Sequence, residues 1–426
     1  MQNKNKIICT IVLFFAITSI QAQRNSSSPY SRYGYGLLSE KSLNFNQALS
    51  NTGIALRPSN HLNFLNPASF TAIDSSHFVF EVGVKNQLTT VSTGGQKATR
   101  SNTNLEYLSA GFPVTRWWGM GLIMTPFSKV GYSYKESQTL IDSTKINTYY
   151  EGSGGNTQFV WANGFKPVKG LSIGINAGLI FGETTYDAYN DLTTDDLSEN
   201  ASKLTTIDMK GLFFESGVQY EYKLTNTKSI IIGMTFSPDQ KLKTKKTLLV
   251  ETTLTGASAV EADTDAIVKS DLPMKIGGGL SYNIKDKLQC GIDYKFQNWT
   301  NVSVFGAKSS YFQKMNSLNM GLEYLPNKYS PHGYFKRVRF RCGLRFLQSN
   351  IALPESESNP KLYSVNEYAG SLGFGLPLKM SANNINLAFE YGSRSTKSSL
   401  MPKETFFVIN LNFTLNENWF YKHKIK

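Results

Sequence analysis

Apolar and polar residues alternate with a period of two in many separate segments of this chain. Between Leu171 and Phe181 every odd-numbered residue is apolar, and residues 172, 174, 176 and 178 are Ser, Gly, Asn and Gly. The segment from Leu288 to Phe296 repeats the pattern, with Asp293 and Lys295 among its polar positions. Successive side chains on a strand point to opposite faces, so each segment predicts a strand with one oily and one polar face. The charges on the polar face indicate a wet lumen.

The connections between these segments alternate between short and long. We predict fourteen strands, and their spans are 77–91, 103–114, 119–135, 155–165, 171–185, 208–223, 229–242, 272–284, 288–302, 317–325, 335–347, 365–376, 384–394 and 405–415. Short links on one side and long loops on the other are typical of an outer-membrane β-barrel with short periplasmic turns. A soluble β-sandwich also alternates, but regular short and long links over so many strands favour the barrel. Both termini then lie on the periplasmic side.

The N-terminus has the pattern of a secretory signal. Lys4 and Lys6 precede an apolar run, and small residues end it near Ala22, which predicts cleavage after residue 22. Residues 23–76 have no long alternating segment and form a separate N-terminal element. The barrel covers 77–415, and 416–426 form a periplasmic C-terminal tail.

Composition narrows the possible partners. The mean hydropathy is −0.27, which is uninformative for a barrel because its strands dilute the lipid face with polar residues. A net charge of +13 could indicate nucleic acid, but secretion argues against that partner. We expect the basic residues to meet anionic lipid headgroups or lipopolysaccharide in the outer membrane.

No catalytic or metal-binding pattern stands out. The four histidines are isolated from one another, and no Ser, His and carboxylate set is apparent. We expect neither an enzyme nor a bound cofactor or metal.

A short motif before the first strand resembles the FadL family of outer-membrane transporters for hydrophobic compounds. Gly53-Ile54-Ala55 and Asn63-Phe64-Leu65 precede Asn66-Pro67-Ala68. In that family an Asn-Pro-Ala element ends an N-terminal hatch that plugs a fourteen-stranded barrel. The resemblance therefore implies that residues 23–76 form a hatch inside the barrel. Pro67 fixes φ at a bend, and the Asn66 amide can pair with freed strand backbone.

The third predicted strand contains Pro126. The resemblance implies an interrupted third strand, through which an apolar ligand leaves sideways into the bilayer. Proline cannot donate to a strand ladder and is expected at an edge, a bulge or a break. A harmless position near the outer end of the strand is an equal alternative for Pro126.

The eleventh predicted strand departs from an oily transporter lumen. Its inward face carries four arginines, and neighbouring strands offer glutamates; the residues are Arg337, Arg339, Arg341, Arg345, Glu323, Glu367 and Glu390. Ion pairs of this kind hold small barrels rigid. Alternatively, the arginines bind a ligand's carboxylate or phosphate, whose geometry suits a guanidinium. A polar lumen favours an amphipathic ligand over a plain hydrocarbon.

Two hypotheses for function follow. The first is an outer-membrane channel that takes up hydrophobic or amphipathic small molecules, with ligand binding coupled to rearrangement of the hatch. The second is a barrel that does not transport and serves as a subunit of an outer-membrane secretion or assembly complex, with other outer-membrane proteins as partners.

Overall fold

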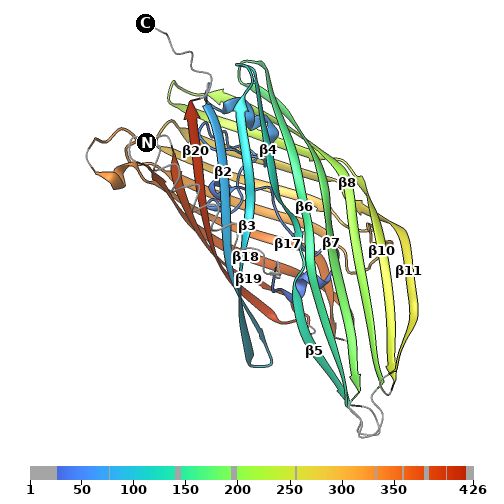
Figure 1. Cartoon of the computed structure of the whole chain (residues 1–426). Coiled ribbons are helices and arrows are strands. Elements are labelled where there is room, and N and C mark those ends of the chain that lie inside the picture. The colour runs from blue at the N-terminus through green and yellow to red at the C-terminus, as the bar shows by residue number, and fades with distance from the viewer. Residues whose placement is uncertain are drawn as a thin grey trace, which may run out of the picture.

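The structure is a computed structural model that describes residues 26–75, 77–139, 145–192, 199–254, 257–331, 333–356, 359–378, 383–399 and 401–418. The predicted signal peptide, residues 23–25 and most of the predicted tail lie outside these residues. Antiparallel strands form one closed barrel, in which the first wall strand pairs with the last (Figure 1). The wall strands are β2 (His77–Thr93), β3 (Gln96–Pro113), β4 (Trp118–Lys129), β5 (Tyr132–Thr139), β6 (Lys145–Val168), β7 (Leu171–Leu192), β8 (Glu199–Lys223), β9 (Lys228–Ser237), β10 (Gln240–Leu254), β11 (Ala257–Leu272), β12 (Lys275–Ile284), β13 (Leu288–Asn298), β16 (Lys314–Tyr324), β17 (Arg339–Ser356), β18 (Asn359–Pro377), β19 (Asn384–Ser395) and β20 (Lys403–Asn418).

Three wall strands are each broken into two pieces. The breaks separate β4 from β5, β9 from β10, and β11 from β12. Pro238 and Pro273 stand at the second and third breaks, where a residue without an N–H cannot continue the ladder. With each broken pair taken as one strand, the barrel has fourteen strands, as the alternation predicted.

The long links differ from the sequence-based prediction. Most of the residues expected in loops at one end of the barrel belong instead to long strand pairs, such as β2 with β3 and β10 with β11 (Figure 1). Gly94 and Gly95, both with positive φ, close the first of these hairpins. These extensions project beyond the apolar band, where water bathes both faces, so their sequences carry no apolar alternation to reveal them.

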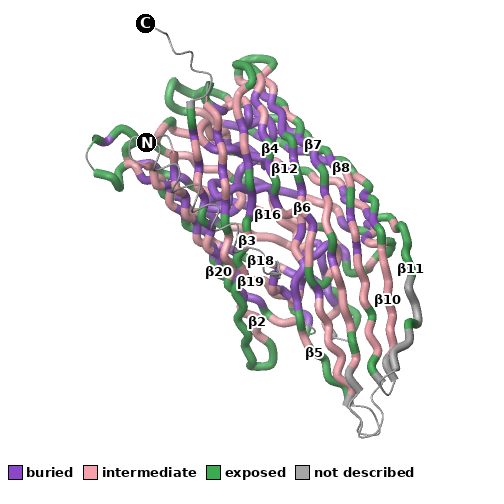
Figure 2. The backbone as a smooth tube through the Cα atoms, in the orientation of Figure 1, coloured by how far each residue is buried: buried purple, intermediate pink, exposed green. Residues whose placement is uncertain are grey.

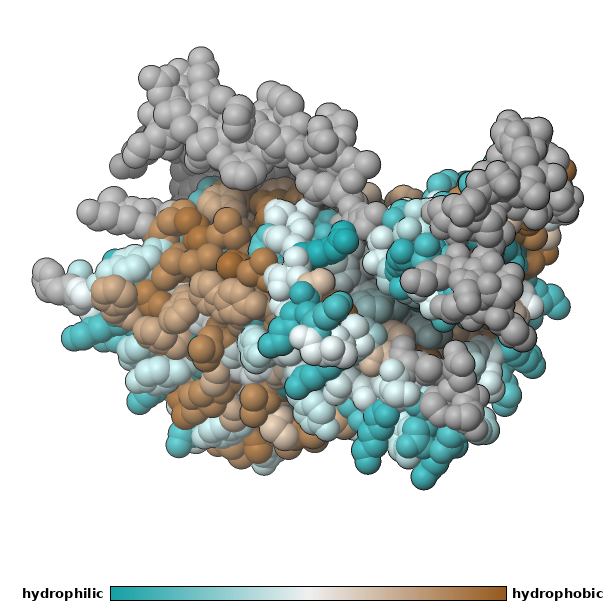
Figure 3. Space-filling model, turned by 90° about the horizontal axis from the view of Figure 1, so that it is seen from below, coloured by the Kyte–Doolittle hydropathy of each residue, from teal (hydrophilic) through white to brown (hydrophobic). Residues whose placement is uncertain are grey.

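Apolar side chains cover the outer wall. Leu212, Ile232, Met234, Leu344 and Leu372 are each at least half exposed. Buried positions concentrate inside the barrel (Figure 2), and hydrophobic side chains gather in one broad patch when the molecule is viewed from the long-hairpin end (Figure 3). Within the described residues, no helix is long and apolar enough to cross a membrane.

The N-terminal element lies within the barrel. Its regular pieces are η1 (Pro29–Arg32), β1 (Leu37–Leu38), α2 (Asn44–Gln47) and η2 (Pro67–Ala72). Most of its residues from Lys41 to Ile73 are buried, and its contacts reach strands all around the wall. We call residues 26–75 the hatch. At the other terminus β20 continues to Asn418, so the predicted tail is wrong in its first residues, which pair with β2.

Two minor strands and one further short helix complete the described elements. β14 (Ser303–Val304) and β15 (Ala307–Lys308) form a small hairpin between β13 and β16. η3 (Tyr334–Arg337) precedes β17 on the short-turn side.

Candidate functional site: hatch, lumen and side wall

The hatch fits the wall at a series of inward-facing glycines. A methyl group added at these positions would collide with hatch atoms, and the glycines are Gly119, Gly121, Gly164, Gly174, Gly217, Gly233, Gly321, Gly343 and Gly373. At Gly233 the added carbon would lie 2.2 Å from the Ile54 carbonyl oxygen, and at Gly217 it would lie 2.1 Å from Asn66 Oδ1. The hatch approaches with backbone at Gly233 and with the Asn66 side chain at Gly217, and both approaches require glycine in the wall. We call these residues the glycine ring. It was not predicted from the sequence, although most of its glycines stand between apolar residues in successive strands.

Asn66 and Asp293 fasten the centre of the hatch. The Asn66 side-chain nitrogen donates to the carbonyls of Ile54, Val218 and Met234 at 2.9, 3.2 and 3.3 Å, and its oxygen accepts from the Ala68 N–H. Pro67 follows as the first residue of η2, where its missing N–H costs nothing. From the wall, Asp293 Oδ2 accepts from the N–H groups of Gly53 and Ile54 at 2.6 and 2.8 Å. Both ends of the Gly53–Ala68 segment are thereby tied to strands.

A charged chain links the hatch to the wall through His61. The imidazole Nδ1 lies 3.2 Å from Glu81 Oε1, and its Nε2 lies 3.5 Å from the Arg341 guanidinium. Arg341 in turn donates to Glu323 at 2.6 Å, and Arg339 donates to the other oxygen of Glu323 at 2.7 Å. Burial lowers the pKa of His61 despite its hydrogen bond to Glu81. The hatch therefore seats with this ring neutral.

A second network lies nearer the long-hairpin end. Arg345 donates to Glu367 and Glu390, each at 2.7 Å, and Arg394 joins Glu367 to Glu404. Glu404 accepts a hydrogen bond from the hydroxyl of Ser28 in the hatch. The structure thus brings together six of the seven predicted lumenal charges, in two groups that are each bonded internally.

Arg337 is the exception, and its predicted place on the inward face is wrong. It ends η3, before β17 begins at Arg339, and its guanidinium lies over the Tyr334 ring. The alternation at Arg337, Arg339 and Arg341 imitates a strand, but Pro331 and Gly333 make the preceding link turn into a short helix first.

The side wall is open between the second and third strands. The backbone ladder between β3 and β4 runs only from Leu108 to Pro113, and farther along β3 the contacts with β4 are made by side chains, such as those of Thr125 and Lys129 with Glu106. On the other side of the opening, Pro126 adjoins a register shift in the pairing of β4 with β6. A bulge is one of the places where proline is tolerated, because it needs no ladder donor.

The start of the hatch fills this opening as an added strand. β1 pairs with β4 through Leu37 with Lys129 and Leu38 with Ser128, and the Ser39 N–H donates to the Phe127 carbonyl at 2.9 Å. The Ser28 N–H likewise donates to the Gly131 carbonyl at 2.9 Å. The edge of β4 is thus satisfied by chain residues that precede the barrel.

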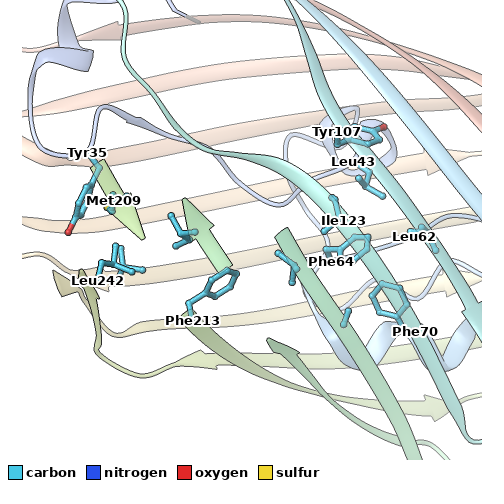
Figure 4. Close-up of a cluster of buried hydrophobic side chains, with 14 of the residues drawn as sticks. Tyr35, Leu43, Leu62, Phe64, Phe70, Tyr107, Ile123, Met209, Phe213 and Leu242 are labelled. Atoms are coloured by element: carbon cyan, nitrogen blue, oxygen red, sulfur yellow. The ribbon is translucent and has the colours of Figure 1, made fainter. Parts of the chain in front are cut away.

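A cavity of about 280 Å³ lies in the lumen beside this segment. Its lining includes Phe127, Phe213 and Trp299 together with Lys295 and Arg345. Figure 4 shows a cluster of buried aromatic and aliphatic side chains from the hatch and the wall, of which Phe213 lines the cavity. An apolar surface interrupted by fixed charges suits a ligand with an oily body and a charged head.

Glu40 and Lys41 are charged residues of the hatch that line the cavity. Lys41 donates to Glu215 at 2.8 Å, while Glu40 lies 3.4 Å from the ammonium of Lys295 and 3.7 Å from that of Lys275. Burial would raise the pKa of the Glu40 carboxyl, but the two ammonium groups outweigh it and hold that pKa at about 2. Glu40 is therefore ionised at neutral pH and attracts the hatch to β12 and β13.

The described residues contain no group of three or more His, Cys, Asp or Glu side chains placed to hold a metal ion.

Solved structures with the same fold include two toluene transporters and a FadL homologue. The Pseudomonas putida toluene transporter TodX matches with a TM-score of 0.58 at 15% identity, over 91% of this chain and 99% of TodX. A Pseudomonas aeruginosa FadL homologue matches with a TM-score of 0.57 at 13% identity, over 91% and 100%. The Ralstonia pickettii toluene transporter TbuX gives 0.52 at 13% identity, over 88% and 97%. No curated protein matches this sequence.

The closed barrel of fourteen strands shares its fold with the FadL homologue, as the resemblance drawn from the sequence implied. The BamG family model matches residues 4–426. The chain belongs to the BamG family.

Proposed function

We propose that this barrel takes up an amphipathic molecule from the outer surface and passes it through the lumenal cavity. The observation that supports this most is the position of the cavity directly behind the opening between β3 and β4. β1 and its neighbours block the opening, so a ligand would move this segment as it passes. The long hairpins face the outside in this proposal, and both termini face the periplasm.

The relative strength of the contacts between hatch and wall predicts which part of the hatch moves first. The hatch core is tied to the wall by buried, charge-assisted hydrogen bonds, whereas β1 meets β4 over only two paired residues. The weaker attachment opens first. The gate is therefore β1 with Ser39. Ser28, which donates to Glu404, and the Asn66-Pro67-Ala68 motif hold the rest of the hatch in place, and Pro126 lies at the rim of the opening.

A reversible disulfide between β1 and β4 tests the gate. Leu38 and Ser128 are register partners in a non-hydrogen-bonded pair, a separation that suits a disulfide. In a Cys290→Ser, Cys342→Ser background, L38C/S128C should block uptake of a fluorescent twelve-carbon carboxylate into liposomes when oxidised, and reduction should restore uptake. Equal uptake in both states would exclude this gate. The single variant L38C serves as the control.

The second candidate is a barrel subunit of an outer-membrane assembly or secretion complex. The fit of the hatch against the glycine ring favours it, because a plug held on all sides suits a closed scaffold. Purification in mild detergent distinguishes the two: a stoichiometric protein partner together with liposomes that take up no probe supports the scaffold, and probe uptake without a partner supports the channel.

A further inference from the structure

Three lysines from adjacent strands form a row on the outer surface of the barrel. Lys243 of β10 is the register partner of both Lys210 of β8 and Lys269 of β11. All three side chains are exposed, and no ion pair within the described part of the chain includes any of them. Like charges directly opposite one another destabilise a sheet. A negatively charged group from outside the chain would offset this repulsion.

The row stands where the apolar wall ends. Leu212, two residues from Lys210 on the same face of β8, is 63% exposed, and its register partner Leu179 on β7 is 40% exposed. Two residues along a strand span about 7 Å. The lysines thus lie one step beyond the lipid-facing band on the long-hairpin side, at the depth of lipid phosphates.

Neighbouring charges are balanced within the protein. Lys241 is the register partner of Asp271, and Lys245 forms an ion pair with Asp265 at 2.9 Å. Asp208 lies one row farther from the apolar band, opposite Lys245. Asp208 and its register partner Glu183 on β7 border the row on that side, so the three lysines form a row of like charge bounded by acidic residues.

A groove of different chemistry lies farther out on the same face. Tyr149 and Tyr189 stack with their ring centroids 4.8 Å apart, and Asp187, Ser202 and Glu251 line the groove beside them. Ser202 and Lys210 are eight residues apart on β8, so they share a face and are separated by about 26 Å. Ring faces, a hydroxyl and carboxylates match sugar hydroxyls and not phosphates.

We propose that the outer face of β7, β8, β10 and β11 is a binding site for a phosphorylated glycolipid of the outer leaflet. Its acyl chains lie along the apolar band, its phosphates meet the lysine row, and its sugars extend to the tyrosine groove. The site is separate from the lumenal cavity and depends on the uptake proposal only for the orientation of the barrel.

Binding to nanodiscs of defined lipid composition tests the site. The full-length barrel is reconstituted in phosphatidylcholine that contains diphosphoryl lipid A, its dephosphorylated form, or phosphatidylglycerol, and bound lipid is counted by native mass spectrometry. K210Q/K243Q/K269Q should retain at least tenfold less diphosphoryl lipid A than the unaltered protein. K223Q/K228Q/K285Q removes the same charge at the short-turn end and should retain the normal amount.

Two further comparisons complete the test. Y149A/Y189A should reduce retention of a full-length glycolipid severalfold and leave retention of lipid A unchanged. The site is overturned if the two triple variants retain equal lipid A, or if phosphatidylglycerol binds as well as lipid A. Heat-dependent migration of each variant on a gel confirms that its barrel is folded.

Discussion

At the scale of the residue, fixed charges decide how the hatch is held. Asp293 is a buried carboxylate, and one of its two oxygens, Oδ2, accepts hydrogen bonds from the backbone N–H groups of Gly53 and Ile54. Hydrogen bonds to an ionised acceptor are stronger than neutral ones, and an unpaired buried donor is costly. This arrangement places much of the hatch's attachment on one side chain of the wall.

Replacement of Asp293 should loosen the hatch without unfolding the barrel. D293A leaves two buried donors unpaired, and we expect it to weaken hatch docking by about 2 to 4 kcal/mol. Hydrogen exchange at Gly53 and Ile54 measures the change. D286A, at the exposed turn between β12 and β13, is the matched control and should change exchange by less than about 0.5 kcal/mol.

His61 should make hatch docking sensitive to pH. Free histidine takes up a proton near pH 6.5, whereas burial lowers the pKa of His61 in the seated hatch. Protons then bind the released hatch more readily, so the seated state loses stability as pH falls below about 6.5. Protease cleavage of the hatch should be faster at pH 5.5 than at pH 7.5.

Substitution of His61 separates its contribution to the pH dependence of hatch docking from that of other titrating groups. H61Q keeps a neutral hydrogen-bonding side chain beside Glu81 and should flatten the pH dependence between 5.5 and 7.5. H77Q, at the start of β2, should leave it intact. An H61Q protein as pH-sensitive as the unaltered one would assign the effect to other groups.

At the scale of the element, the wall strands are shaped to receive the hatch. β8 and β9 each present a glycine where hatch backbone or side chain touches the strand. Exposed apolar residues stand beside these glycines on the lipid side, namely Val218, Ile232 and Met234. One alternating pattern in these strands therefore provides both the outer surface that contacts lipid and the inner surface that contacts the hatch. A larger inward side chain at these heights would displace the hatch.

A pair of glycine substitutions separates the steric clash with the hatch from the general effect of replacing glycine by alanine in a strand. G233A places a methyl group against the Ile54 carbonyl, and we expect a loss of hatch docking of about 1 to 3 kcal/mol. G278A, on neighbouring β12, meets no atom within 4 Å and should be neutral or slightly stabilising. Hydrogen exchange in the hatch measures both. Equal effects would mean that the ring does not position the hatch.

At the scale of the whole molecule, the hatch turns a barrel into a closed body. Its charged contacts to strands β2, β13, β17 and β20 spread the attachment around the wall. Removing it should leave a barrel whose strands remain paired, because the wall closes through β2 and β20 without the hatch.

Deletion of residues 23–74 should open the lumen. We expect ion conductance in a planar bilayer to rise well above that of the intact protein, while the barrel still shifts its gel mobility on heating. A deletion variant that conducts no better than the intact protein would show that something other than the hatch seals the barrel.

The sequence by itself determined the membrane wall. Alternation between lipid and lumen is a local consequence of strand geometry, so Leu171 as the start of β7, His77 as the start of β2 and the number of strands could all be predicted. The Asn66-Pro67-Ala68 motif, through its resemblance to the FadL family, predicted a hatch before the first strand, whereas its bonds to Val218 and Met234 are visible only in the fold.

Only the tertiary structure decided what the two faces of the wall do. The glycine ring, the pairing of β1 with β4 and the lysine row each join residues far apart in the chain, and period-two alternation carries no information about height or register between strands. The extended hairpins were hidden for a related reason, since strands with water on both faces lose the alternation. Arg337 was misplaced because a local pattern cannot reveal where a strand begins.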